Sequence, residues 1–183
     1  LKSGIKVKHL KSEITVIPLE KSHIPQLWDI MQGCPDFFAD DLTIDDDLTI
    51  DNYEKFLYYL LNKVTDTLVA IKGDEVLGCA YLENLDTEKG FGCAALFIKR
   101  KSLTPLETLS ILRANIPYYF KKHNLNMLYM VTRITNKAVI KLVKALGFSG
   151  FQILKNYQQV KGKAVDCVLA GLIKENLCNN GGK

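Results

Sequence analysis

Three strand-like runs follow one another between residues 67 and 98, and they constrain the fold more than any other part of the chain. Residues 67–72 and 75–85 are rich in apolar side chains and flank the dipeptide Gly73-Asp74, which is typical of a tight hairpin turn. Residues 91–98 are almost continuously apolar, as expected for a central strand that is covered on both faces. The sequence therefore predicts an antiparallel hairpin followed by a buried strand.

The helix that follows has the best-marked start in the sequence. Thr104, Pro105 and Glu107 supply an N-cap, a proline at the first helical position and the acid of a capping box. This helix is expected to run to about Asn124, with a kink at Pro117, where one backbone donor is missing.

Strand-like and helical segments alternate over the rest of the chain. Alternation of side chains and helical periodicity predict a strand at 13–19, a helix from Ser22 to Gly33, a helix that begins with a capping box at Asp51 and Glu54, a strand at 126–133, a helix at 135–146, and strands at 151–160 and 164–174. The predicted order is β-α-α-β-β-β-α-β-α-β-β. We therefore expect an α/β (α+β) fold with a mixed, mostly antiparallel central sheet of about seven strands, flanked by helices.

The length and composition are those of one globular domain. The chain has 183 residues, of which 48% are hydrophobic and 24% are charged, and no linker interrupts the predicted elements. Residues 13–174 are expected to form the domain. Residues 1–12 are expected to be an N-terminal extension, and the polar residues 175–183 a flexible tail.

Charge, cysteines and hydropathy exclude several classes of protein. The net charge of +4 is too small to imply binding to nucleic acid. The five cysteines show no C-x-x-C spacing, so no zinc site is expected, and their use indicates a reducing compartment. No apolar run reaches the length of a membrane span or resembles a signal peptide. We expect a cytoplasmic protein with neither a nucleic-acid nor a membrane partner.

Residues 136–148 read Asn-Lys-Ala-Val-Ile-Lys-Leu-Val-Lys-Ala-Leu-Gly-Phe. An Asn after a strand, an apolar helical face and a Leu-Gly-Phe exit into a strand resemble the GNAT superfamily of acetyl-CoA-dependent N-acetyltransferases, whose order of elements is similar to the one predicted for residues 13–174. A simpler interpretation is that Asn136 only caps a helix. The resemblance implies that acetyl-CoA is the cosubstrate. It also implies that an acetyl group is transferred to a primary amine of a small molecule or peptide by direct attack in a ternary complex.

The resemblance also implies which residues bind the cosubstrate. Backbone groups of the central strand would hold the pantetheine arm and polarise the thioester carbonyl, and the next loop would face the pyrophosphate at a helix N-terminus. The residues that match these places are Leu96, Phe97, Ile98, Arg100, Lys101, Ser102, Leu103, Thr104 and, after the next strand, Asn136. The basic triplet at 99–101 could neutralise phosphates, or it could simply be a solvated turn.

Two positions depart from the family pattern. Leu103 and Pro105 stand where the family has small residues that let backbone N–H groups surround the pyrophosphate, and a proline has no N–H to offer. Val143 stands where many members carry a Tyr that protonates the leaving thiolate. A second hypothesis is therefore a binding or structural protein that keeps the fold without acetyl transfer, like degenerate members found in phage genomes.

Candidates for the general base are Glu83, Tyr81 and Tyr157, each of which could instead be an ordinary strand residue. Residues 36–51 contain seven Asp, which could attract a cationic acceptor or could merely cap helices and solvate a loop. An edge strand near the C-terminus could pair two copies of the chain into a homodimer, as in many relatives.

Overall fold

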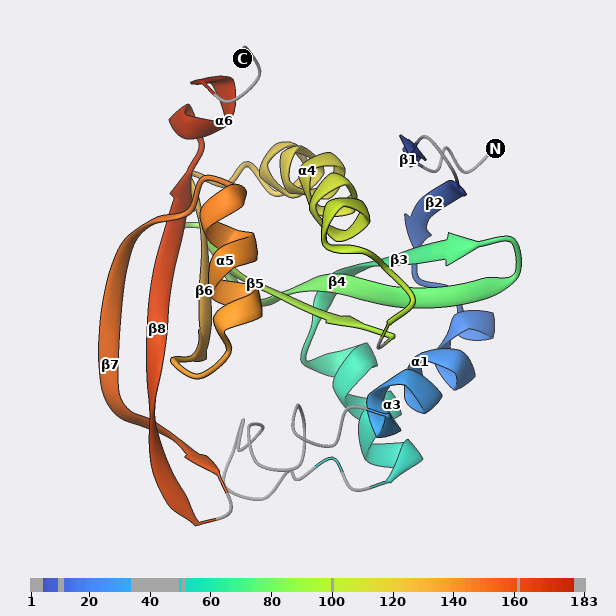
Figure 1. Cartoon of the computed structure of the whole chain (residues 1–183), viewed down its shortest axis with the longest axis horizontal. Helices are drawn as coiled ribbons and strands as arrows, with labels where there is room; N and C mark the ends of the chain where they lie inside the picture. Colours follow the sequence, from blue (N-terminus) through green and yellow to red (C-terminus); the bar gives the residue numbers. More distant parts are fainter. Residues whose placement is uncertain are drawn as a thin grey trace.

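A twisted eight-stranded sheet with helices on both faces organises the molecule (Figure 1). The structure is a computed structural model, and it describes residues 5–9, 12–33, 50, 52–99, 101–160 and 162–179. The strand order is β1-β2-β3-β4-β5-β6-β8-β7, and every neighbouring pair is antiparallel except β5 and β6. The predicted fold class, a mixed and mostly antiparallel sheet flanked by helices, is confirmed.

The strands are β1 (Ile5–His9), β2 (Ser12–Pro18), β3 (Thr65–Lys72), β4 (Glu75–Asp86), β5 (Phe91–Ile98), β6 (Met127–Arg133), β7 (Ser149–Val160) and β8 (Lys163–Ile173). The helices are η1 (Lys21–His23), α1 (Ile24–Gln32), α3 (Tyr53–Asn62), α4 (Pro105–Lys122), α5 (Lys137–Ala145) and α6 (Glu175–Asn179). Within the described residues no helix is long and apolar enough to cross a membrane.

Both ends of the chain differ from the sequence prediction. Residues 5–9, expected to belong to an extension, form β1 and pair with β2 from Ile5↔Val16 to His9↔Ser12. The sheet therefore has eight strands rather than about seven, because the open edge of β2 accepts one more strand. Residues 175–179, expected to belong to a flexible tail, form the short helix α6.

Local signals placed most helix and hairpin ends correctly. Gly73 has a φ of +60° in the turn that joins β3 to β4. Thr104 Oγ1 accepts from the backbone N–H of Glu107 at 3.2 Å, while the Glu107 carboxylate accepts from the N–H of Thr104 at 2.8 Å. The predicted capping box of α4 is thus confirmed, and α4 continues through Pro117. The predicted cap of α3 is off by one residue, because Asn52 accepts from the N–H of Lys55.

Two hydrophobic cores lie on opposite faces of the sheet. On one face, α4 and α5 pack against residues such as Leu68, Leu82 and Leu128. On the other face, α1 and α3 pack against a set that includes Val69 and Tyr81. Adjacent residues of one strand, such as Leu68 and Val69, enter different cores, because successive side chains of a strand point to opposite faces.

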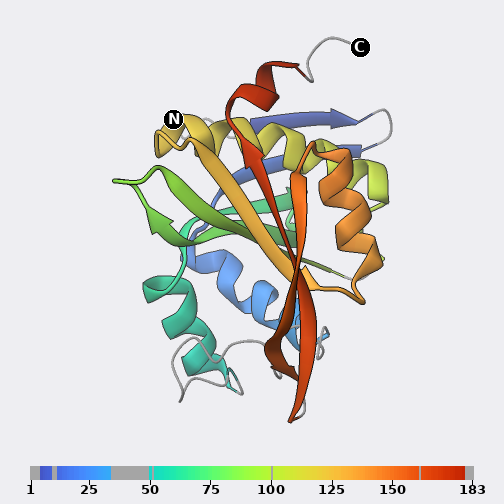
Figure 2. The ribbon, with the colours of Figure 1, turned by 90° about the vertical axis from the view of Figure 1, so that its left-hand side faces the viewer.

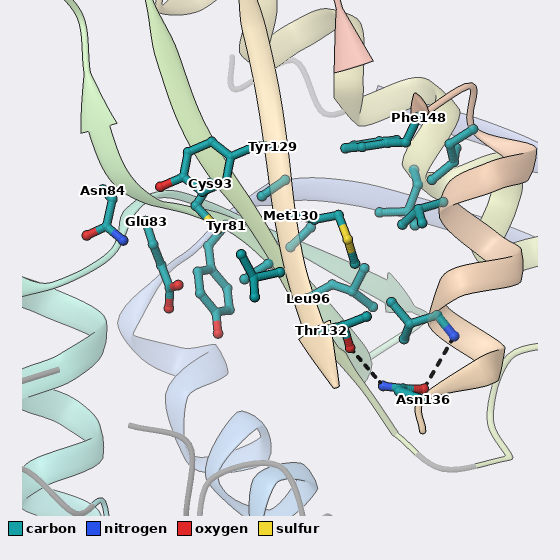
Figure 3. Close-up of a pocket in the computed structure, with 18 of the residues that line it drawn as sticks. Tyr81, Glu83, Asn84, Cys93, Leu96, Tyr129, Met130, Thr132, Asn136 and Phe148 are labelled. Atoms are coloured by element: carbon teal, nitrogen blue, oxygen red, sulfur yellow. Dashed lines mark hydrogen bonds between the residues drawn. The ribbon is translucent and has the colours of Figure 1, made fainter. Parts of the chain in front are cut away.

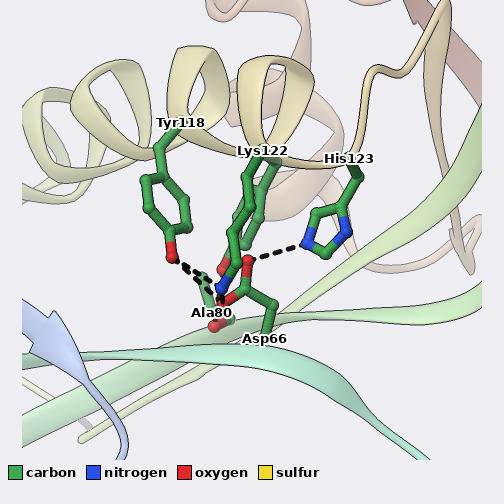
Figure 4. Close-up of polar contacts among 6 residues, drawn as sticks. Asp66, Ala80, Tyr118, Lys122 and His123 are labelled. Carbon is green, nitrogen blue, oxygen red and sulfur yellow. Dashed lines mark hydrogen bonds and ion pairs between the residues drawn. The ribbon is translucent and has the colours of Figure 1, made fainter.

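Asp66 holds the C-terminal end of α4 against the beginning of β3 (Figure 4). Its side chain is only 6% exposed and accepts from Lys122 Nζ at 2.5 Å and from the Tyr118 hydroxyl at 3.2 Å. His123 Nε2 lies 2.8 Å from the other carboxylate oxygen. Since α4 leads from β5 to β6, this cluster fixes the helix to the half of the sheet formed by β1 to β5.

Candidate active site

The parallel strands β5 and β6 pair over three residues and then separate. The pairs are Phe91↔Met127, Gly92↔Leu128 and Cys93↔Tyr129. Beyond them β5 stays paired with β4 as far as Ile98, and β6 stays paired with β8 as far as Arg133. The sheet therefore opens between residues 94–98 and 130–133, and we call this opening the wedge. It lies at the carboxyl end of both strands, where α/β folds commonly bind ligands.

A cavity of about 550 Å³ fills the wedge (Figure 3). This volume is within the range of small-molecule sites. Apolar side chains of α4 and α5 and of the following segment form one wall, among them Leu112, Ile116, Val139, Val143 and Phe148. Polar side chains line the rest of the cavity, among them Tyr81, Glu83, Asn84, Tyr129, Asn136 and Tyr157. The cavity thus combines an apolar wall with several polar groups.

Three polar side chains meet at one side of the cavity. The Tyr59 hydroxyl donates a hydrogen bond to the Glu83 carboxylate and lies 3.3 Å from the Tyr81 hydroxyl. Burial raises the pKa of Glu83, and the hydrogen bond from Tyr59 partly offsets this rise. Burial also raises the pKa of both tyrosines, so they stay protonated near neutral pH. Glu83 is therefore the member of this cluster that can exchange a proton.

The structure brings two of the three predicted base candidates together and separates the third. Glu83 and Tyr81 lie on β4 in the same cluster, whereas Tyr157 on β7 is 57% exposed and lies at the rim. Tyr59, on α3, was not predicted. It is only 1% exposed, and its place three residues after Phe56 on the buried helix face was the available signal, because a buried tyrosine hydroxyl usually has a partner.

Asn136 caps α5 and lines the cavity as well. Its Oδ1 accepts from the backbone N–H of Val139 at 3.3 Å, and its Nδ2 lies 3.4 Å from Thr132 Oγ1 (Figure 3). The capping interpretation is confirmed, and it does not compete with ligand binding, because the oxygen makes the cap while the NH₂ group is on the other side of the amide. Val143 lines the same cavity and has no proton to give.

The residues predicted to bind the pantetheine arm differ in position. Leu96 lines the wedge. Phe97 is buried in the core beneath α1 and α3, so only its backbone could face a ligand. Ile98 is the last residue of β5 and pairs with Gly78.

In the loop predicted to bind the pyrophosphate, several backbone N–H groups already donate hydrogen bonds to oxygens of the protein. The N–H of Lys99 donates to Leu77 O at 2.8 Å, and that of Ser102 to Lys99 O at 3.2 Å. The N–H groups of Thr104 and Glu107 are bonded within the capping box. The Glu107 carboxylate thus occupies the place where a helix N-terminus attracts anions.

Two side chains near this loop also make contacts within the protein. Lys99 Nζ pairs with Glu75 at 2.5 Å, and Leu103 packs against the core beneath α4. Lys101 is exposed with a φ of +65°. Arg100 and all of the acidic segment 36–51 except Ile50 lie outside the described residues. The described residues bring together no group of three or more His, Cys, Asp or Glu that could hold a metal ion.

Comparison with known proteins identifies the family. The sequence model of the acetyltransferase (GNAT) domain matches residues 38–169, which is more than half of the chain. The chain belongs to the GNAT acetyltransferase family. GNAT acetyltransferases use acetyl-CoA, in agreement with the cosubstrate predicted from the sequence.

Solved structures of GNAT acetyltransferases share the fold. A RimL ribosomal L7/L12 α-N-protein acetyltransferase in complex with coenzyme A is 11% identical, with a TM-score of 0.73 over 92% of this chain and 98% of that chain. A ribosomal-protein-S5-alanine acetyltransferase from Vibrio fischeri is 14% identical, with a TM-score of 0.74 over 96% of this chain and 99% of that chain. A mutant of the spermidine N-acetyltransferase SpeG from Vibrio cholerae is 13% identical, with a TM-score of 0.76 over 91% of this chain and 96% of that chain. No curated protein matches significantly.

Proposed function

We propose that this GNAT protein is an N-acetyltransferase that moves an acetyl group from acetyl-CoA to a primary amine of a small molecule or a protein. The amine would attack the thioester directly while both substrates are bound. The observation that carries the proposal is the wedge, because it places a cavity of suitable size beside a half-buried carboxylate, Glu83.

The acyl arm of the donor fits the wedge. Pantetheine is an extended chain with amide groups, and such a chain can pair with the edge of a strand as a peptide does. The edge of β5 that faces β6 is proposed to take this pairing at Ala94 to Leu96, since β6 has separated there. Ala94, Ala95 and Leu96 all line the cavity. The carbonyl of the thioester would then lie near the polar side of the cavity.

The pyrophosphate does not fit the beginning of α4 as the structure shows it. The capping box fills that helix terminus with the Glu107 carboxylate, and Pro105 contributes no donor. This region favours the second hypothesis, a binding protein without transfer. The proposal therefore rests on the fit of the pantetheine arm and the acetyl group of acetyl-CoA to the wedge, and not on a site for the pyrophosphate.

Glu83 is proposed as the general base. A primary amine is protonated near neutral pH and must lose a proton before or during attack. Burial raises the pKa of Glu83 and so makes its carboxylate a stronger base than a solvated one. The ammonium form loses its first proton to solvent before attack. As the nitrogen–carbon bond forms and the carbon–sulfur bond breaks, the second proton of the amine passes to Glu83. The thiolate then takes a proton from water, because thiols have an ordinary pKa of about 8.5.

The acceptor is proposed to be an amine on a polyamine or a protein. Structures with the same fold bear the names of a spermidine acetyltransferase and of ribosomal-protein acetyltransferases, which supports an amine acceptor in general. The acidic segment 36–51 would favour a cationic acceptor through its local field. We also propose that β7, the outermost strand with exposed Ile153, pairs two copies of the chain.

The test is acetyl transfer by the wild-type protein and by Glu83→Gln. Thiol release from acetyl-CoA would be measured with spermidine, with a lysine peptide and with a peptide that has an N-terminal alanine. We expect Glu83→Gln to lower kcat/KM by about 10²- to 10⁴-fold, the usual contribution of a general base, and to leave CoA affinity within about twofold. Glu88→Gln, an exposed glutamate in the turn after β4, is the matched control.

Two results would contradict the proposal. Equal rates for Glu83→Gln and the wild type would rule out Glu83 as the base. A wild-type protein that binds CoA in calorimetry but acetylates none of the three amines would support the binding protein instead.

A further inference from the structure

A buried amide in the middle of α4 lacks a hydrogen-bond partner for its oxygen. Asn115 is only 1% exposed, and its Oδ1 has no partner among the described residues. Its neighbours on the same helix face, Leu112 and Ile116, are buried and apolar. Buried polar groups in proteins are nearly always paired, because a buried group without a partner loses its hydration and gains nothing.

Other buried polar groups of the same helix are paired. The Thr108 hydroxyl donates to Thr104 O at 3.1 Å, and the Tyr119 hydroxyl donates to Ala80 O at 2.8 Å. Asn115 is thus the exception among the described residues, since no other buried side-chain oxygen or nitrogen there lacks a partner.

Asn115 lines the wedge cavity. Helix α4 contributes four residues to that cavity, namely Leu112, Asn115, Ile116 and Tyr119, and Asn115 is the one amide among them. Its side chain therefore borders the wedge on a wall that is otherwise largely apolar, although Oδ1 itself is buried in the free protein. The edge of β5 lies along the same cavity, at Ala94 to Leu96.

A buried water is a weaker explanation for the unpaired oxygen. Asn115 also lines a cavity of about 20 Å³ between α4, β4 and β5, and one water needs roughly 10–15 Å³. A buried water needs two to four polar partners. The side chains around this small cavity are apolar except for Asn115, Cys79 and Thr108, and the Thr108 proton is already donated to Thr104 O.

We propose that Asn115 accepts a hydrogen bond from an amide N–H of the pantetheine arm of the donor. This inference rests on the proposed function. An arm that pairs with the edge of β5 on one side carries amide N–H groups past the α4 wall, where Asn115 is the one amide. Asn115 Oδ1 supplies an acceptor from the helix side, and its partner arrives with the ligand. Asn115 thus binds the pantetheine arm of acetyl-CoA and has no part in proton transfer.

The test compares Asn115→Leu with the wild type in calorimetric titrations with CoA and with 4′-phosphopantetheine, which has the arm but no adenosine. We expect Asn115→Leu to weaken both ligands by the same factor, about five- to tenfold, the worth of one hydrogen bond. The free variant should melt no lower than the wild type, because an unpaired buried polar group has been replaced by an apolar one of similar size. Thr108→Val, on the same helix face but outside the wedge cavity, should leave both affinities within about twofold.

Each other outcome overturns the inference in a distinguishable way. Unchanged affinities for Asn115→Leu overturn it and leave the proposed function standing. A loss of affinity for CoA alone places the contact outside the arm and also overturns it. A wild-type protein that binds neither ligand overturns this inference and the proposed function together. Should Asn115→Leu fail to fold, Asn115→Ala, which adds no bulk, must show the same loss for both ligands.

Discussion

The wedge and the N-terminus of α4 are consecutive along the chain, yet they offer very different environments to a ligand. In the wedge, β6 leaves the edge of β5 after Cys93, and a cavity opens beside it. At the start of α4, the protein bonds its own backbone donors, and Glu107 supplies the negative charge that a phosphate would bring. Under the proposed function, the two ends of one donor molecule would therefore meet different environments.

The two regions also differ in what they do for stability. A capping box stabilises a helix by about 0.5–2 kcal/mol, so the start of α4 contributes to folding. The wedge leaves strand edges apart and Asn115 unpaired, which contributes nothing to folding. Backbone and side-chain groups that lack hydrogen bonds in the free protein are the groups that a ligand can pair with.

Filling the wedge should have the largest effect. Ala94 is a small, half-buried residue of β5 that lines the cavity, and Ala94→Phe would put a ring where the arm is proposed to lie. We expect CoA affinity, measured by calorimetry, to fall about 100-fold or more, or about 3 kcal/mol. Ala138→Phe, the same change at an exposed site on α5, is the control. Normal CoA binding by Ala94→Phe would show that the donor does not enter the wedge.

Removing the hydroxyl of Tyr59 should have an intermediate effect that depends on pH. The hydrogen bond from Tyr59 lowers the pKa of Glu83, so Tyr59→Phe raises that pKa further. Since the ionised carboxylate is the active base, kcat/KM rises with pH through this pKa. The acid limb should move to higher pH by about one unit, with about tenfold lower kcat/KM below the limb and near-normal kcat/KM above it.

Tyr58→Phe is the control for this pH shift, because Tyr58 is the exposed neighbour on α3. It should leave the pH profile of kcat/KM where the wild type has it. An acid limb that does not move in Tyr59→Phe would mean that the limb does not report Glu83.

Neutralising Glu107 should have the smallest effect and the opposite sign. Glu107→Gln removes a negative charge from the first turn of α4, so CoA affinity at low ionic strength should rise about two- to fivefold if the phosphates lie there. The melting temperature should fall, since the capping box is weakened. Glu175→Gln in α6 serves as the control. An unchanged or lower affinity would place the phosphates elsewhere.

The fold was largely predictable because its boundaries are set by local chemistry. Gly73-Asp74 and the Thr104–Glu107 pair act through neighbours in the sequence, and both were confirmed. Strand β1 was missed, although Ile5 to Lys8 alternates apolar and basic residues. Whether such a segment joins a sheet depends on an open edge elsewhere, and the edge of β2 is a property of the folded molecule.

The site was predictable only in part. Glu83 and Tyr81 could be named because they lie on a predicted strand, but their contact with Tyr59 joins β4 to a helix more than twenty residues away. The point where β5 and β6 separate leaves no signal in either strand. Asn115 could have been noticed, since it interrupts an apolar helix face that includes Ile111 and Ile116.

The short pairing of β5 with β6 has a consequence for how the chain could be divided. One side of the wedge holds β1 to β5, with α4 tied to them through Asp66, and the other side holds β6 to β8, all from residues 127–173. The sheet joins these two contiguous stretches through three residue pairs (Figure 2). A ligand in the wedge would touch both and act as a noncovalent crosslink. Cutting the chain just before β6 would then yield two fragments that also share the core beneath α4 and α5, and the ligand should strengthen their reassembly.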